Sequence, residues 1–180
     1  SLYYSFFTLS GRTIVHPRRF QNNVALINID SGNLVSIPTA AGPSHAAVYA
    51  NGTRAYVSHW LSARTITDID LTTNSVVRTF TTSADLWGPI ACNPSGTKLA
   101  VSIQNASFVL DTVTAAAGPT LSTASVNEMY TTADGNHAFC VGFNGSLISL
   151  NTGALLANTN TAVSASFGCV SPVSARGAGF

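Results

Sequence analysis

Residues 51–80 read NGTRAYVSHWLSARTITDIDLTTNSVVRTF, and the plan of this stretch recurs along the chain. It holds a Gly-containing turn, an apolar run, a polar gap, a second run that ends at Asp70, another turn and a third run. An Asp or Asn recurs at the end of such a run at a nearly fixed interval. Successive members of the series Asp30, Asp70, Asp111 and Asn151 are 40, 41 and 40 residues apart. The chain is therefore an array of one repeating unit.

The runs are short and rich in apolar and β-branched residues, and none has the length or pattern of a helix of three turns. A period of about 40 residues with strand-like content is the sequence signature of a β-propeller blade. We predict an all-β fold, a β-propeller of four-stranded blades, with about four blades and the first strand of a fifth. The predicted bounds are residues 2–41, 42–84, 85–124, 125–162 and 163–180.

The turns of the repeat carry Asn-Gly, Asp-Gly and Ser-Gly pairs. Gly and Asn supply the positive φ that tight hairpins require, and an Asp or Asn at the first position of a turn caps the backbone with its side chain. The repeating Asp or Asn is thus expected to stabilise a turn and not to act in catalysis. Residues 115–119 depart from the pattern where the second turn of the third unit is expected.

Several of these elements resemble a known repeat family. Residues 51–58 and 93–101 are similar to the turn-and-strand core of the YVTN-type β-propeller repeat, and residues 69–77 resemble its Asp-containing element. The resemblance covers nearly the whole chain and implies a relation to surface-layer or lactonase-like propellers, which usually close with about seven blades. It is specific for the repeat and not for an activity, because the loops have diverged.

A chain of 180 residues supplies fewer blades than such a ring needs, and blades left at an open end would expose apolar sheet surface. Three arrangements are open: part of a longer polypeptide, two copies that pair into a ring, or a four-bladed ring closed by the strand of the fifth repeat. We favour the first, because the sequence lacks an initiator Met, starts inside a strand and ends within a repeat.

The charge and hydropathy of the chain limit the classes of partner that it can bind. Eight basic and seven acidic residues give a formal net charge of +1. The basic pair Arg18-Arg19 is too short to bind nucleic acid, and no run of 18 apolar residues exists to span a membrane. A composition rich in Ser, Thr and Asn and poor in Lys is typical of secreted, periplasmic or cell-surface proteins, and we expect that location.

Three cysteines are expected to be buried small hydrophobic residues. Cys92 and Cys169 lie at equivalent places two blades apart, too far for a disulfide. Cys140 and Cys169 belong to neighbouring predicted blades, so the sequence leaves a disulfide between these two residues as an open alternative. Their spacing fits no zinc motif.

In a propeller, the starts of the innermost strands and the loops that link blades converge at one mouth of the central channel. The candidate ligand-binding residues there are His45, Asp85, Trp87, Asn127 and Glu128. A His and a Glu that face one channel could bind a metal or act as acid and base. The alternative is that both are solvated residues at the rim.

A second candidate set lies in the loops that we expect between the second and third strands of the first two blades. It comprises His16, His59 and Trp60, with Phe20 nearby. An aromatic ring that stacks and a polar neighbour that donates hydrogen bonds suit sugar or peptide recognition. The alternative is that Trp60 and Phe20 pack between blades.

These observations favour a noncatalytic extracellular or envelope module that binds a protein or a glycan, with no catalytic residue, no metal and no cofactor. A lactonase-like, metal-centred propeller enzyme is the first alternative, although it needs several inward carboxylates. The second alternative is a structural subunit in which residues 165–170 complete a blade of the next copy, as a homo-oligomer.

Overall fold

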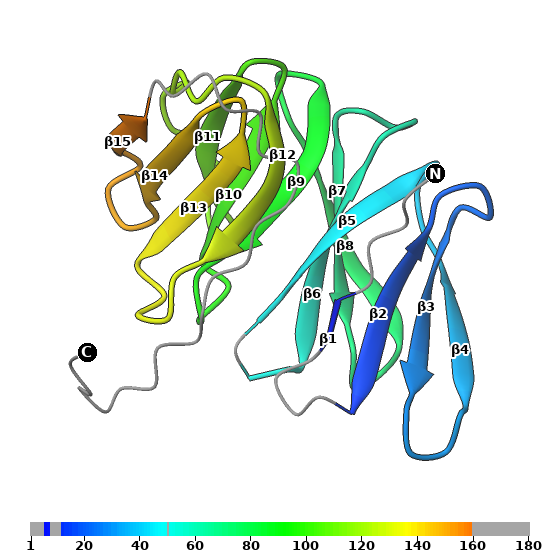
Figure 1. Ribbon diagram of the computed structural model, residues 1–180. Helices are drawn as coiled ribbons and strands as arrows, with labels where there is room; N and C mark the ends of the chain where they lie inside the picture. The colour runs from blue at the N-terminus through cyan, green and yellow to red at the C-terminus, as the bar shows by residue number, and fades with distance from the viewer. Residues whose placement is uncertain (1–5, 8–11, 50, 160–180) are drawn as a thin grey trace.

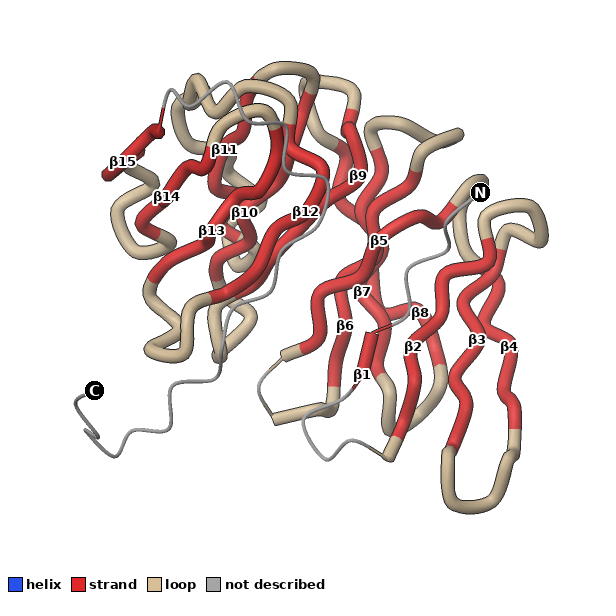
Figure 2. The backbone as a smooth tube through the Cα atoms, viewed as in Figure 1, coloured by secondary structure: helices blue, strands red, loops and turns tan. Residues whose placement is uncertain are grey.

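The computed structural model describes residues 6–7, 12–49 and 51–159 of the chain. Within them the chain contains only strands, turns and loops, and the strands form four antiparallel sheets that follow one another in space (Figures 1 and 2). The predicted all-β class is confirmed. The predicted fifth repeat lies outside the described residues.

The strands, numbered in chain order, pair with their sequence neighbours. The first sheet contains β1 (Phe6–Phe7), β2 (Thr13–Arg18), β3 (Asn23–Asn28) and β4 (Leu34–Pro38). The second contains β5 (Pro43–Val48), β6 (Arg54–His59), β7 (Thr65–Asp70) and β8 (Ser75–Thr81). The third contains β9 (Leu86–Cys92), β10 (Lys98–Ile103) and β11 (Ala106–Asp111). The fourth contains β12 (Val126–Thr131), β13 (His137–Gly142), β14 (Gly145–Ser149) and β15 (Leu155–Thr159).

The turn after the third strand of each sheet is capped by one side chain. Oδ1 of Asp70 accepts hydrogen bonds from the backbone amides of Thr72 and Thr73, at 2.8 and 3.0 Å. In every sheet the residue four positions after the cap has positive φ. The four caps and their positive-φ partners are Asn28 with Gly32, Asp70 with Asn74, Asp111 with Ala115, and Ser149 with Gly153.

The capping role predicted from the regular interval is confirmed for Asp70 and Asp111 but wrong for Asp30 and Asn151. Asp30 forms an exposed ion pair with Arg12, and the side-chain amide of Asn151 donates to Oδ1 of Asn136 at 3.1 Å. The strand register explains the difference. Each capping residue pairs with the first residue of the second strand of its sheet. In the first and fourth sheets this pairing selects Asn28 and Ser149, which lie two residues before Asp30 and Asn151.

The departure at residues 115–119 coincides with a change in the third sheet. Instead of a fourth strand, two isolated bridges hold the following segment against β11, one from Ser107 to Leu121 and one from Leu110 to Ala117. The edge of β11 is therefore covered without a regular strand.

Ala115 has a φ of 60°, although an Ala side chain disfavours the left-handed region. Because Asn74 holds the equivalent place in the second sheet, we expect Ala115→Asn to raise the free energy of unfolding by about 1 kcal/mol. Urea denaturation measures the change. Ala116→Asn is the matched control, and an equal effect of both substitutions would contradict this account of the turn.

Hydrophobic clusters fill the spaces between successive sheets. One lies between the first and second sheets around Val15 and Val57, one between the second and third around Tyr56 and Leu99, and one between the third and fourth around Ala100. Each inner sheet thus buries both of its faces, one against the preceding sheet and one against the following sheet.

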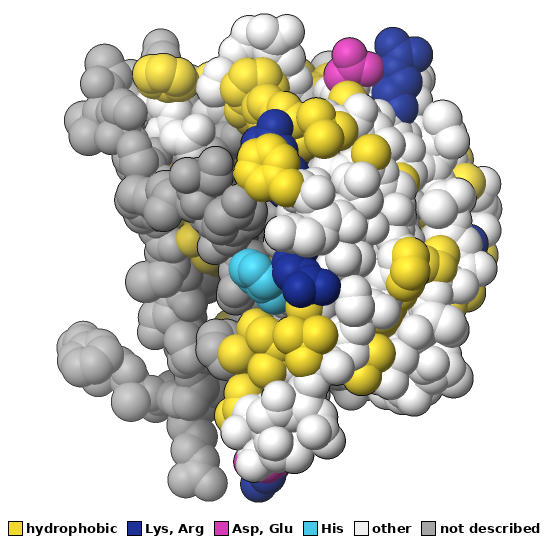
Figure 3. Space-filling view, turned by 90° about the vertical axis from the view of Figure 1, so that its right-hand side faces the viewer, with side chains coloured by type: hydrophobic (Ala, Val, Ile, Leu, Met, Phe, Trp, Pro, Cys, Tyr) yellow, Lys and Arg dark blue, Asp and Glu magenta, His cyan; other side chains and the backbone are white. Residues whose placement is uncertain are grey.

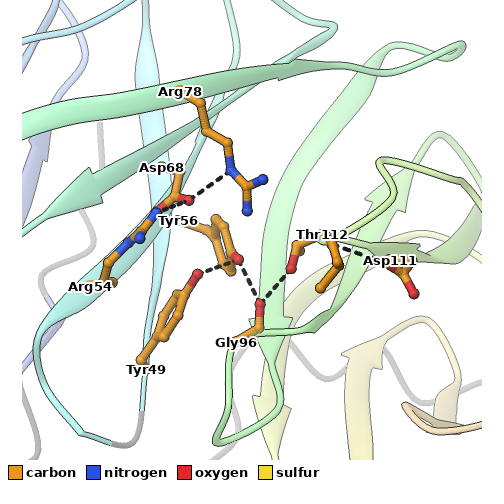
Figure 4. Close-up of polar contacts among 9 residues, drawn as sticks. Tyr49, Arg54, Tyr56, Asp68, Arg78, Gly96, Asp111 and Thr112 are labelled. Atoms are coloured by element: carbon orange, nitrogen blue, oxygen red, sulfur yellow. Dashed lines mark hydrogen bonds and ion pairs between the residues drawn. The ribbon is translucent and has the colours of Figure 1, made fainter.

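A chain of hydroxyl contacts joins the second sheet to the third (Figure 4). The Tyr49 hydroxyl donates to that of Tyr56, which donates to the backbone carbonyl of Gly96 at 2.6 Å. The Thr112 hydroxyl donates to the same carbonyl at 2.7 Å. The turn at Gly96 is therefore held from both sheets.

Asp68 lies beside this chain and its side chain is completely buried. Arg54 and Arg78 both donate to its carboxylate, the second at 3.1 Å (Figure 4). A buried carboxylate needs such partners to offset its desolvation. Asp68 is thus a structural residue of the second sheet, with both arginines on the same sheet.

Candidate binding surface

The innermost strands of the second, third and fourth sheets begin with an irregularity. β9 lies between β5 and β12 (Figure 1). The pairing of β5 skips Ser44, that of β12 skips Asn127, and that of β9 shifts across residues 87–89. Such bulges re-aim side chains and are frequent beside functional sites. These bulges lie at the strand starts that the sequence analysis predicted to surround the channel mouth.

His45 is buried between β5 and β9 and is not a solvated rim residue. It is 9% exposed, and its ring lies so close to Gly88 that a Cβ added there would be 2.8 Å from Cε1 and Nδ1. The hydroxyl of Ser58, on the neighbouring strand β6, donates to the carbonyl of Gly88 on β9. Burial lowers the pKa of His45 to about 4, so the ring is neutral at pH 7.

Glu128 occupies on β12 the register position that His45 occupies on β5, and it is also buried, at 6% exposed. The rim alternative is therefore wrong for both residues. The two side chains stand on strands that β9 separates. Asn127, at the bulge before Glu128, is half-buried. Among residues 12–49 and 51–159, no three His, Cys, Asp or Glu side chains converge as a metal site would require.

The outer-loop histidines are not in loops. His16 lies within β2, half-buried, where burial and the nearby charge of Arg18 lower its pKa. His59 ends β6 and is completely buried, with Nε2 2.8 Å from the Thr67 hydroxyl. Burial lowers the pKa of His59 to about 4. Direct ligand contact by His59 is thus excluded in this conformation, because β6 extends to His59, which the sequence analysis expected in a loop.

Trp60 and Trp87, predicted in two separate candidate sets, lie together. Trp60 follows β6 directly and Trp87 lies at the start of β9. Their ring centroids are 5.4 Å apart with an interplanar angle of 52°, and the two side chains are 38% and 36% exposed. Trp60 therefore packs against a residue of the following sheet, as the alternative expected, and still keeps more than a third of its surface accessible.

Three further side chains from neighbouring loops extend this pair. The Arg19 guanidinium lies 4.9 Å from the Trp60 ring centroid and 5.8 Å from that of Phe20. Phe20 and Leu61 are 64% and 59% exposed, so Phe20 does not pack between blades. We call these five residues, Arg19, Phe20, Trp60, Leu61 and Trp87, the aromatic patch. It joins residues from three successive sheets.

The loop that carries the patch is fixed to the backbone beneath it. The amide of Trp60 donates to the carbonyl of Gly42 at 2.7 Å, and a Cβ at Gly42 would lie 2.6 Å from the amide nitrogen of Leu61. Only Gly allows this approach, because its φ is also positive at 69°. Arg64 lies in the connection between β6 and β7, and Asp85 lies in the connection between β8 and β9. Their side chains form an exposed ion pair at 2.8 Å.

One face of the molecule carries few charged side chains. The face in Figure 3 is mostly white, with hydrophobic side chains in groups beside a few Lys or Arg side chains. Exposed aromatic side chains gathered in this way are typical of interaction sites. No helix within the described residues has the length and apolar character to cross a membrane.

A cavity of about 270 Å³ opens between the third and fourth sheets, beside the segment that replaces the missing fourth strand. Lys98 and Asp111 form an ion pair of 2.7 Å in its wall. The Lys98 ammonium and the amides of the turn hold the pKa of Asp111 far below its usual range. The cavity was not predicted, because it follows from a lost strand and not from a motif.

The cysteines fit their expected role as far as they are described. Cys92 and Cys140 are free and buried, and burial raises the pKa of each thiol to about 12. Cys169 lies outside the described residues, so the disulfide with Cys140 stays a prediction.

No protein-family model and no curated protein matches this sequence. Among solved structures, hydrazine synthase of Kuenenia stuttgartiensis matches with a TM-score of 0.73 and 17% identity, over 86% of this chain and 47% of that chain. The Cps50 (Swd1) β-propeller domain of Myceliophteria thermophila matches with a TM-score of 0.70 and 12% identity, over 89% of this chain and 55% of that chain.

At these identities the likeness concerns the fold alone. The chain spans about half the length of the solved structures it matches. Four successive antiparallel sheets and these neighbours confirm the predicted architecture. The chain has a β-propeller fold with about four blades, and each sheet described above is one blade.

Proposed function

We propose that this propeller is a noncatalytic binding module that holds a protein or glycan ligand on the aromatic patch. The observation that carries the proposal is the tilted, partly exposed pair of Trp60 and Trp87, with the Arg19 guanidinium over Trp60. Exposed Trp and Arg side chains on a fixed backbone are the residue types that dominate binding energies at interfaces.

The chemistry of the patch suits such ligands. Indole rings present flat apolar faces to the C–H faces of sugars or to peptide side chains, while the indole N–H donates a hydrogen bond. Arg19 adds donors and a positive charge beside the rings, where it attracts a carboxylate or a hydroxyl group. Because the residues come from three successive blades, the patch is shaped by blade packing.

We further propose that the chain is a YVTN-type repeat propeller and acts outside the cytoplasm, as a secreted, periplasmic or cell-surface protein. The turn-and-strand elements at residues 51–58 and 93–101 support the family, and both form the predicted turn and strand. The surface low in charge and poor in Lys supports the location.

An array of immobilised neutral and acidic oligosaccharides and extended peptides tests the binding function. We expect the wild-type protein to bind a subset of the array and Trp60→Ala to lose at least about 30-fold in affinity, as for a hot-spot residue. The melting temperature should stay nearly unchanged, because Trp60 is 38% exposed and lies in a loop.

Phe143→Ala is the matched control, since Phe143 lies in the turn between β13 and β14, is 58% exposed and is outside the patch. It should bind like the wild type. Equal binding by wild type and Trp60→Ala would remove the patch as the site, and a large fall in melting temperature would show that Trp60 belongs to the core.

A further inference from the structure

Arg19 of the aromatic patch carries a positive charge that no Asp or Glu of the chain neutralises. Within residues 12–49 and 51–159, the basic side chains that form ion pairs with Asp are Arg12, Arg54, Arg64, Arg78 and Lys98. Arg18 donates instead to the neutral side chains of Asn23 and Ser36. Every Asp and Glu of the sequence lies in the described ranges, so no undescribed acidic side chain is left to pair with Arg19.

The setting of Arg19 favours an anionic ligand group. The side chain is half-buried, and its guanidinium lies 4.9 Å from the Trp60 ring centroid and 5.8 Å from that of Phe20. Its Nε–H is buried and has no hydrogen-bond partner among the described residues. A guanidinium that is partly desolvated and lacks an acceptor gains most from a carboxylate, because the two groups pair through charge-assisted hydrogen bonds.

The remaining polar groups of the patch are also donors. Its side chains are those of Arg, Phe, Trp and Leu, so the guanidinium and the indole N–H groups donate and no side-chain oxygen accepts. Asp85, in the connection before Trp87, is already paired with Arg64. Sugar hydroxyls both donate and accept hydrogen bonds, whereas a carboxylate only accepts. The patch therefore fits a carboxylate better than a row of hydroxyl groups.

The shape of the patch favours a peptide for the same reason. The Arg19 guanidinium covers one face of the Trp60 ring, and the Trp87 ring is tilted by 52° from that of Trp60. The two indoles thus share no flat surface on which a sugar ring could stack. Leu61, which is 59% exposed, adds an aliphatic surface that suits apolar side chains.

We infer that the aromatic patch binds an acidic peptide segment of a partner protein. Apolar side chains of the segment lie against Trp60, Trp87 and Leu61, and a neighbouring carboxylate pairs with Arg19. Complementary charge selects the partner, while the buried aromatic contacts supply most of the affinity. This inference rests on the proposed function and narrows its ligand from a protein or a glycan to an acidic protein segment.

A peptide array with matched pairs tests the inference on the wild-type protein. Each member combines apolar residues with Asp or Glu, and its counterpart has Asn for Asp and Gln for Glu. Uronic acid oligosaccharides on the same support carry carboxylates on a glycan. We expect binding to a subset of the acidic peptides, a loss of at least about 10-fold for their neutral counterparts, and weaker binding as the NaCl concentration rises.

Arg19→Gln should lose at least about 10-fold in affinity for the selected acidic peptides. It should bind the neutral counterparts as the wild type does. Arg19→Lys keeps the charge and should keep the preference for acidic peptides. Arg12→Gln is the matched control, because it removes the same charge at the opposite end of β2, and it should bind like the wild type. Melting temperatures check that the variants fold.

The outcomes separate this inference from the proposed function. Equal binding of acidic peptides and their neutral counterparts would overturn the inference, and so would an equal loss for Arg12→Gln and Arg19→Gln. Binding of oligosaccharides and of no peptide would also overturn it, while the proposed function would stand if Trp60→Ala abolished that binding. Acidic peptides that bind Trp60→Ala as tightly as the wild type would contradict both.

Discussion

Acidification from pH 7 to pH 4 is expected to lower the free energy of unfolding by roughly 3 kcal/mol for each of His45 and His59. Burial lowers the pKa of both side chains to about 4 in the folded protein, whereas His in an unfolded chain titrates at about 6.5. Between these values the unfolded chain binds protons that the folded protein does not bind. Stability therefore falls as the pH falls through this window and levels off below it.

Urea denaturation at several pH values measures this dependence. His45→Gln and His59→Gln should each remove a large and similar part of the slope between pH 6.5 and 4, and His16, whose pKa is also lowered, contributes to the remainder. Asp70 and Asp134 contribute at lower pH, because hydrogen bonds from neighbouring Thr side chains and backbone amides lower the pKa of each carboxyl to about 2. Their stabilisation is lost only below about pH 4. A flat stability profile between pH 6.5 and 4 would show that neither His is held neutral by burial.

Gly96→Ala is expected to lower the free energy of unfolding by about 3 kcal/mol, from backbone strain and overpacking together. Gly96 has a φ of 68°, and a Cβ there would lie 2.0 Å from Cε2 of Tyr49. Tyr49 would have to move, which breaks its contact with Tyr56 and loosens the hydroxyl chain that ends at the Gly96 carbonyl (Figure 4). The blades would thus lose a polar link as well as packing.

Gly32→Ala separates the two causes. Gly32 has a φ of 71°, and no atom lies within 4 Å of the place of an added Cβ. This substitution therefore costs only the left-handed strain, about 1 kcal/mol. Thermal or urea denaturation of both variants gives the difference. Similar losses for Gly32→Ala and Gly96→Ala would mean that the contact with Tyr49 contributes nothing.

The repeat made the fold predictable from the sequence, because turn chemistry is local. Asp70 and Asp111 cap the turns as expected, since an Asp side chain reaches the amides two and three residues on. The regular interval gave a wrong prediction at Asp30 and Asn151 because loop lengths vary between the repeats. Only the strand register shows which residue holds the capping position of Asp70 and Asp111.

The aromatic patch was predictable in its two tryptophans and not in its arrangement. Trp60 and Trp87 were both candidates, but their contact depends on how the second and third blades pack, which no local pattern encodes. His59 is adjacent to Trp60 and yet completely buried, because alternate residues at a strand end point to opposite sides. A sequence contains the side-chain chemistry, while exposure depends on where each strand ends.

Tryptophan fluorescence tests the proposed binding site most directly, because Trp60 and Trp87 are the two tryptophans of the chain. Titration with an oligosaccharide or peptide that the array selects should change the intensity or wavelength of the emission as the site fills. The change should follow the binding curve from calorimetry, and Phe143→Ala should reproduce it. Emission that stays constant while calorimetry reports saturable binding would place the ligand elsewhere and contradict the account.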